Sequence, residues 1–169
     1  EAILGVLPSY TNLGMASLLP RKNIEIDEKG DIFVDGINTQ GMYNREKILK
    51  KYCDEAITIQ YNEIIDMNRE EYGEIFVGKK LIYIYKPQTE RDVFKGVEAA
   101  FKDINNLIRK LVNNVSATNI LVTTDHGFTH RRFPVEESEK IGKEVSNPCS
   151  VALQEIILPV IKFRNIRRD

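Results

Sequence analysis

Two apolar, strand-like segments near the centre of the sequence flank one long amphipathic segment, and this arrangement constrains the fold more than any other feature. Residues 81–85 are β-branched and aromatic, as in a buried strand. The next segment has apolar residues at steps of three and four through about residue 114, which predicts a helix with one buried stripe. Residues 119–124 again have the composition of a strand. This order predicts a βαβ unit with parallel strands and a right-handed crossover, whose helix stripe is formed by Val93, Val97, Ala100, Phe101, Ile104, Leu107, Ile108, Leu111 and Val115.

An Asp-His pair directly follows the second of these strands. Ligands of parallel sheets bind in the crevice outside the carboxyl ends of the strands, so Asp125 and His126 lie where a binding site is expected. A carboxylate oxygen and an imidazole nitrogen can also converge on one divalent cation. The pair alone does not separate this interpretation from an ordinary loop with a capping aspartate.

Near the N-terminus, residues 2–7 predict a short strand, and a helix is expected to run from about Thr11 to Leu19, where Pro20 ends it. Hydroxyl side chains, Ser9 and Thr11, stand at the start of this helix. One of them could cap exposed backbone N–H groups. The same helix start would also attract a phosphate oxygen, and both interpretations stay open at this point.

The region between these features predicts a hairpin and a helix. Residues 24–27 and 31–34 alternate between apolar and polar types around a turn, as hairpin strands do. An Asp-Gly turn follows at residues 35–36, and residues 43–52 predict an exposed helix. Three of its side chains are expected to face inward, namely Ile48, Leu49 and Tyr52.

Further segments receive simpler predictions. Residues 56–61 predict a strand, residues 62–69 a short helix and residues 70–74 an acidic, solvated connection. Residues 135–144 are polar and helix-prone, and a last edge strand is expected around Pro159.

Length and composition indicate a soluble globular class. A chain of 169 residues with 42% hydrophobic content can bury one sizeable core, and a net charge of -1 argues against a general attraction to nucleic acid or membranes.

Cys53 and Cys149 have neither disulfide-framework nor zinc-site spacing, so reduced thiols are expected. No apolar run reaches the length of a membrane span, and we expect a cytoplasmic protein with no membrane partner. Because the sequence begins without Met and in an apolar stretch, we expect a fragment of a longer protein.

Four blocks of the sequence resemble one known family, the PglZ domain. The first is residues 7–20, Leu-Pro-Ser-Tyr-Thr-Asn-Leu-Gly-Met-Ala-Ser-Leu-Leu-Pro. The second is the Asp-Gly turn at residues 35–36, followed by Thr39, Arg45 and the Ile-Leu pair at residues 48–49. The third is residues 122–128, Val-Thr-Thr-Asp-His-Gly-Phe, and the fourth is residues 153–160, Leu-Gln-Glu-Ile-Ile-Leu-Pro-Val. The blocks follow the family's order and span nearly the whole chain.

The resemblance implies a single domain over residues 1–169 with an alkaline phosphatase-like fold, a three-layer α/β/α sandwich around a mostly parallel sheet. It implies a metal-dependent phosphatase or phosphodiesterase of the bacterial phage-defence systems called Pgl and BREX. In that reading Thr11 is the nucleophile, and Asp125 and His126 are ligands of a divalent metal, zinc or manganese, that also binds Thr11. The implied partners are a phosphate-ester substrate and other phage-defence proteins.

Departures from the family pattern keep two other functions open. The superfamily's first metal ligand is an Asp upstream of residues 8–11, before this sequence begins, and only residues 86–88 stand where the family usually carries further ligands. The chain also lacks the His-Gly-Gly that tends to precede the fourth block. These departures favour a catalytically inactive scaffold or interaction module of the defence complex. A third hypothesis is contact with a DNA backbone through residues 130–132 and the basic end at residues 164–168.

Overall fold

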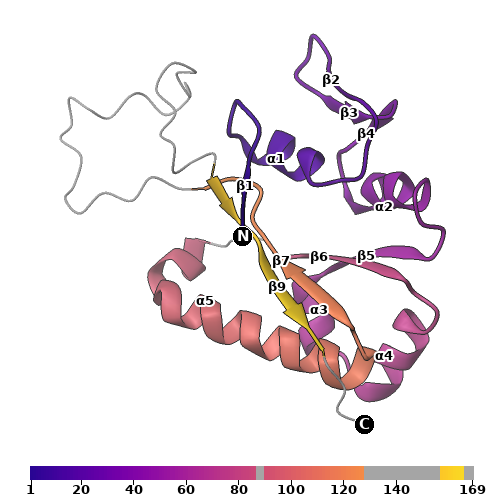
Figure 1. Ribbon diagram of the computed structural model, residues 1–169, viewed down its shortest axis with the longest axis vertical. Helices are drawn as coiled ribbons and strands as arrows, with labels where there is room; N and C mark the ends of the chain where they lie inside the picture. The colour runs from indigo at the N-terminus through magenta and orange to yellow at the C-terminus, as the bar shows by residue number, and fades with distance from the viewer. Residues whose placement is uncertain (87–89, 128–156, 166–169) are drawn as a thin grey trace. The chain divides into compact units, whose positions relative to one another are not determined.

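The computed structural model describes residues 1–86, 90–127 and 157–165 of the chain and shows a mixed α/β protein (Figure 1). The chain divides into two compact units. The first contains Glu1–Gln40 and Leu121–Ile161, and the second contains Gly41–Ile120 and Lys162–Asp169. The helix predicted at residues 135–144 and the basic segment at residues 130–132 lie outside the described residues.

In the first unit, a small antiparallel sheet forms from β2 (Ile24–Ile26), β3 (Ile32–Val34) and β4 (Ile37–Asn38). The predicted hairpin is confirmed, and β4 extends it by a strand that the sequence did not predict. Asp35 and Gly36 join β3 to β4 with φ angles of 49° and 78°. Positive φ at both positions is characteristic of the tight two-residue hairpin turn that an Asp-Gly pair favours.

The predicted N-terminal strand and helix are present as β1 (Ala2–Leu4) and α1 (Thr11–Ser17). Helix α1 packs on β3, and the buried side chains of this unit include Leu13, Ala16, Ile32 and Val34. Strand β1 pairs antiparallel with β8 (Ile157–Pro159), which confirms the predicted strand around Pro159. Leu158 of β8 is almost fully buried.

The second unit contains a parallel strand pair covered by helices. β5 (Ala56–Gln60) pairs with β6 (Leu81–Tyr85) in the register Ala56↔Leu81. The helices are α2 (Met42–Lys50), α3 (Tyr61–Asp66), α4 (Arg69–Phe76) and α5 (Glu90–Lys110), and α5 continues into a π-helical turn, η1 (Leu111–Val115). Apolar side chains from the strands and from α3, α4, α5 and η1 form one core cluster, which includes Ile59, Ile64, Tyr72, Phe76, Ile82, Ile84, Leu107 and Val115.

A buried threonine joins α2 to β5. The backbone N–H of Thr58 donates to Glu46 Oε2 at 2.9 Å. Partial burial acts to raise the pKa of Glu46, but the hydrogen bonds and charge supplied by Lys50 and Thr58 outweigh it and leave that pKa below its ordinary value. The Glu46 carboxylate is therefore a stable acceptor for β5 at neutral pH.

The acidic segment at residues 70–74 is helical, and the prediction of a solvated connection was wrong. Asn68 caps α4, because its Oδ1 accepts from the N–H groups of Glu70 and Glu71, and Glu71 Oε2 accepts in return from Asn68 N–H. Tyr72 and Phe76, four residues apart, bury their rings on one face of this helix. The acidic side chains of the segment occupy exposed positions, Glu70 and Glu71 before Tyr72 and Glu74 between the two rings.

Two single side chains also differ from the expected pattern. Tyr52, expected to face inward, is 44% exposed, because α2 ends at Lys50 and Tyr52 lies beyond it. Phe101, expected in the buried stripe of α5, is 54% exposed. Ile48, Leu49 and Leu111 are buried as predicted.

The strand, helix and strand of the predicted βαβ unit are all present, as β6, α5 and β7. Whether β6 and β7 belong to one parallel sheet stays a prediction. β7 (Asn119–Val122) follows η1 and pairs with β9 (Ile161–Arg164), whereas β6 pairs with β5. Within the described residues the strands form small separate sheets, so the three-layer sandwich with a mostly parallel sheet is not confirmed.

None of the helices within these residues is long and apolar enough to cross a membrane.

Candidate active site

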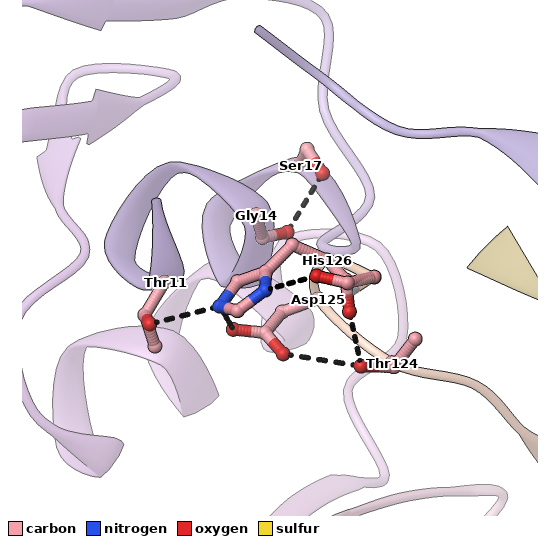
Figure 2. A network of polar contacts seen from close by, with 7 residues as sticks. Thr11, Gly14, Ser17, Thr124, Asp125 and His126 are labelled. Carbon is pink, nitrogen blue, oxygen red and sulfur yellow. Dashed lines mark hydrogen bonds and ion pairs between the residues drawn. The ribbon is translucent and has the colours of Figure 1, made fainter. Parts of the chain in front are cut away.

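Thr11 is the first residue of α1, and its side chain faces the turn after β7. The residue that caps α1 is Tyr10, which makes no side-chain cap hydrogen bond. The Thr11 hydroxyl instead lies 3.2 Å from His126 Nε2, a residue 115 positions away in the sequence (Figure 2). Thr11 therefore does not act as the N-cap, and its hydroxyl is used in a tertiary contact.

The hydrogen bonds of His126 indicate which of its two ring nitrogens carries a proton. Nδ1 lies 3.0 Å from the carbonyl oxygen of Gly127. A carbonyl oxygen can only accept, so Nδ1 carries a proton and donates it. In the neutral ring Nε2 then has a free electron pair directed at Thr11, and it accepts a hydrogen bond from the hydroxyl.

Two neighbours shape the same turn. The Thr124 hydroxyl donates to the backbone carbonyl of His126 at 2.8 Å and lies 3.4 Å from Asp125 Oδ1. The other carboxylate oxygen, Asp125 Oδ2, is 3.6 Å from His126 Nε2. The side chains of Asp125 and His126 are 25% and 19% exposed, so both are accessible to a ligand.

The structure therefore brings together Thr11, Asp125 and His126, the three residues that the sequence proposed as one site. His130, the other histidine of the chain, lies outside the described residues. The sequence reasoning missed Thr124, which orients the turn, and it missed the role of Gly14. A glycine inside a predicted helix is a signal for close packing, and that signal was available.

Gly14 is where α1 comes closest to the Asp-His turn. A Cβ added to Gly14 would lie 2.3 Å from the carbonyl oxygen of Asp125 and 2.8 Å from its carbonyl carbon. Ser17 Oγ donates to the carbonyl oxygen of Gly14 at 2.7 Å, so the next turn of α1 also binds this residue (Figure 2). Backbone therefore meets backbone at this contact.

The donor atoms of the site fit a divalent cation. Zinc ligands lie about 2.0–2.2 Å from the ion, so two ligands of one tetrahedral ion are about 3.3 Å apart. The separations of 3.2 Å from Thr11 Oγ1 to His126 Nε2 and of 3.6 Å from Nε2 to Asp125 Oδ2 are close to that value. No group of three or more His, Cys, Asp and Glu side chains suited to a metal occurs in the described parts of the chain, so Asp125 and His126 do not by themselves make a complete metal site.

Comparison with known families matches residues 1–150 to the BREX system PglZ alkaline phosphatase-like domain. The chain belongs to the PglZ family. The resemblance to this family is thereby confirmed, the first three of the four sequence blocks lie within the matched residues, and the fold is assigned to an alkaline phosphatase-like family of a bacterial phage-defence system.

Curated relatives support the same family. The alkaline phosphatase-like protein PglZ of Bacillus cereus (strain H3081.97) is 41% identical over 155 residues, which cover 86% of this chain and 18% of that protein. The alkaline phosphatase-like protein BrxZ of Escherichia coli O9:H4 (strain HS) is 32% identical over 148 residues, covering 81% of this chain and 17% of that protein. The chain thus spans less than a fifth of the length of these relatives. No solved structure matches it.

Proposed function

We propose that this PglZ chain contributes a nucleophile and two metal ligands to a metal-dependent phosphatase or phosphodiesterase of a BREX or Pgl phage-defence system. Thr11 is the nucleophile, and Asp125 and His126 are the metal ligands. The observation that carries the proposal is the contact of Thr11 Oγ1 with His126 Nε2, beside the Asp125 carboxylate. The same proposal places the described strands in a three-layer α/β/α sandwich with a mostly parallel sheet, in a cytoplasmic protein.

In such a site, Gly127, Thr124 and Thr11 would have separate roles. The Gly127 carbonyl keeps the proton on Nδ1 of His126, so that Nε2 is available as a ligand atom. Thr124 holds the backbone of the turn through the carbonyl of His126. Helix α1 presents the Thr11 hydroxyl to these atoms. After losing its proton to water, the Thr11 oxygen would form a bond to the phosphorus of an ester as the bond from phosphorus to the ester oxygen breaks, and the leaving oxygen would take a proton from water.

Zinc or manganese is the cation proposed for this donor set, because an imidazole nitrogen suits zinc and oxygen ligands such as a carboxylate suit manganese. When bound, the ion would lower the pKa of the Thr11 hydroxyl and neutralise charge on the phosphate. The proposed substrate is a phosphate ester, with the phosphodiesters of nucleic acid as one class, and the proposed partners are other proteins of the defence system.

The test compares Thr11→Ala, Thr11→Ser and Thr118→Ala in the chain and in a version extended to the length of the curated relatives. Metal content and hydrolysis of aryl phosphate monoesters and diesters are measured with zinc or manganese. Thr11→Ala should lower hydrolysis more than about 100-fold, since the attacking oxygen is lost. Thr11→Ser retains a hydroxyl and should keep part of the activity, and the exposed Thr118 is the matched control.

Two results would count against the proposal. Full activity of Thr11→Ala would remove Thr11 from the nucleophile role. Absence of both metal uptake and hydrolysis in the extended version would favour a catalytically inactive scaffold or interaction module instead.

A further inference from the structure

We infer that Gly14 is a positioning residue, whose missing side chain allows α1 to approach the Asp125 backbone closely enough for Thr11 to reach His126. The inference goes beyond the proposed function, because it concerns how the contact is made. Only the statement that this contact serves catalysis rests on the proposed function.

The first step of the argument is the spacing along α1. Gly14 follows Thr11 by three residues, so the two lie one above the other on the same face of the helix. That face meets the turn after β7 at two points. Thr11 contacts the His126 ring, and Gly14 contacts the Asp125 backbone.

The second step is the nature of the atoms that Gly14 approaches. An added Cβ would lie 2.3 Å from the carbonyl oxygen of Asp125, 2.8 Å from its carbonyl carbon and 3.1 Å from its Cβ. Contacts under 3.0 Å require movement, and the two shortest involve backbone atoms, which no change of rotamer can displace. Either α1 or the turn must therefore shift. Because α1 carries Thr11 and the turn carries His126, either shift changes the distance between the hydroxyl and Nε2.

The third step is that no other property of glycine accounts for its presence. Gly14 is buried inside a helix, and its φ is not in the left-handed region that favours glycine. Glycine is a poorer helix former than any ordinary residue except proline, so helix formation alone would favour alanine here. Close packing against Asp125 supplies the reason.

The chain offers a matched control in Gly73. This glycine also lies inside a helix, α4, and a Cβ added there has no atom within 4 Å. Gly73→Ala and Gly14→Ala therefore make the same chemical change in two helices, and only the second creates a contact.

The experiment detects the contact between Thr11 Oγ1 and His126 Nε2 through the nitrogen NMR resonances of the His126 ring, on protein prepared without metal. The chain has two histidines, so a His130→Asn parent leaves one imidazole signal to follow. In that parent, Thr11→Val should shift the Nε2 resonance, because it removes the hydroxyl that donates to this nitrogen. In the Gly73→Ala background the same shift should remain in full. In the Gly14→Ala background Thr11→Val should leave the resonance unchanged, since the contact is already broken.

An equal response to Thr11→Val in all three backgrounds would overturn the inference. If Gly14→Ala does not fold, the unsubstituted chain provides a second test, a nuclear Overhauser contact between the Gly14 α-protons and the Asp125 β-protons. Its presence supports the close approach and its absence overturns it. None of these measurements depends on hydrolysis or metal uptake, so the inference and the proposed function can fail separately.

Discussion

Helices α1 and α4 each contain an internal glycine, and the two helices are attached to their surroundings in opposite ways. α4 is anchored by large side chains, since the rings of Tyr72 and Phe76 are buried while Gly73 is exposed. α1 also buries Leu13 and Ala16, but at Gly14 it has no side chain and its backbone lies against the backbone of Asp125. Side-chain packing is sufficient where a helix only covers a core cluster. A backbone contact sets a shorter distance, and α1 uses it where two polar groups must meet.

The largest expected effect tests the side-chain anchor of α4. Phe76→Ala should lower the free energy of unfolding by about 3–5 kcal/mol, because it removes a ring that is only 4% exposed and leaves a cavity in the core cluster. Its neighbour Val77 is 78% exposed, and Val77→Ala should change that free energy by no more than about 0.5 kcal/mol. Urea-induced unfolding measures both. Equal losses for the two variants would show that α4 is not anchored by its buried face.

The second prediction sets the two glycines against each other. Gly73→Ala should raise the free energy of unfolding by about 0.5–1 kcal/mol, since alanine is the better helix former and the new methyl group meets no atom. Gly14→Ala has the same gain in helix propensity, but the overpacking against Asp125 should give a net loss of about 1–3 kcal/mol. The same urea titrations give both values. Stabilisation by Gly14→Ala would contradict the close backbone contact.

Local patterns predicted elements well where apolar residues dominate. The β-branched run at residues 81–85 and the alternating segments at residues 24–27 and 31–34 gave a strand and a hairpin in the right places, since both depend on nearby residues. The helix α4 was missed because its exposed acidic face outweighed the two buried rings in the pattern. Asn68, with Glu71 three residues later, was a capping signal that would have corrected the prediction.

The candidate site could be predicted only as a set of residues. The Thr11 hydroxyl and the Asp-His pair were proposed together from family resemblance, and their separation by 115 residues places the contact beyond any local pattern. Strand partners were also beyond reach, because nothing in the sequence of β6 distinguishes β5 as its neighbour. The contact of Gly14 with the Asp125 carbonyl depends on how closely two backbones approach, and that distance is a property of the folded chain alone.

The smallest expected effect separates two tyrosines of the unit that contains α4. The Tyr72 hydroxyl donates to the carbonyl oxygen of Ile64 at 2.8 Å, so Tyr72→Phe should cost about 0.5–1.5 kcal/mol of unfolding free energy by removing one of the two hydrogen bonds that this carbonyl accepts, the other coming from Met67 N–H. The Tyr85 hydroxyl is buried and has no hydrogen-bond partner among the described residues. Burial, opposed by the charge of Arg45, raises the pKa of Tyr85 to about 12, so the hydroxyl is neutral when unfolding is measured at pH 7. Tyr85→Phe should therefore be neutral or stabilising by a few tenths of a kcal/mol. A loss as large as that of Tyr72→Phe would mean that the Tyr85 hydroxyl is hydrogen-bonded, with the neighbouring Arg45 guanidinium as the candidate partner, and that polar contacts as well as rings anchor this unit.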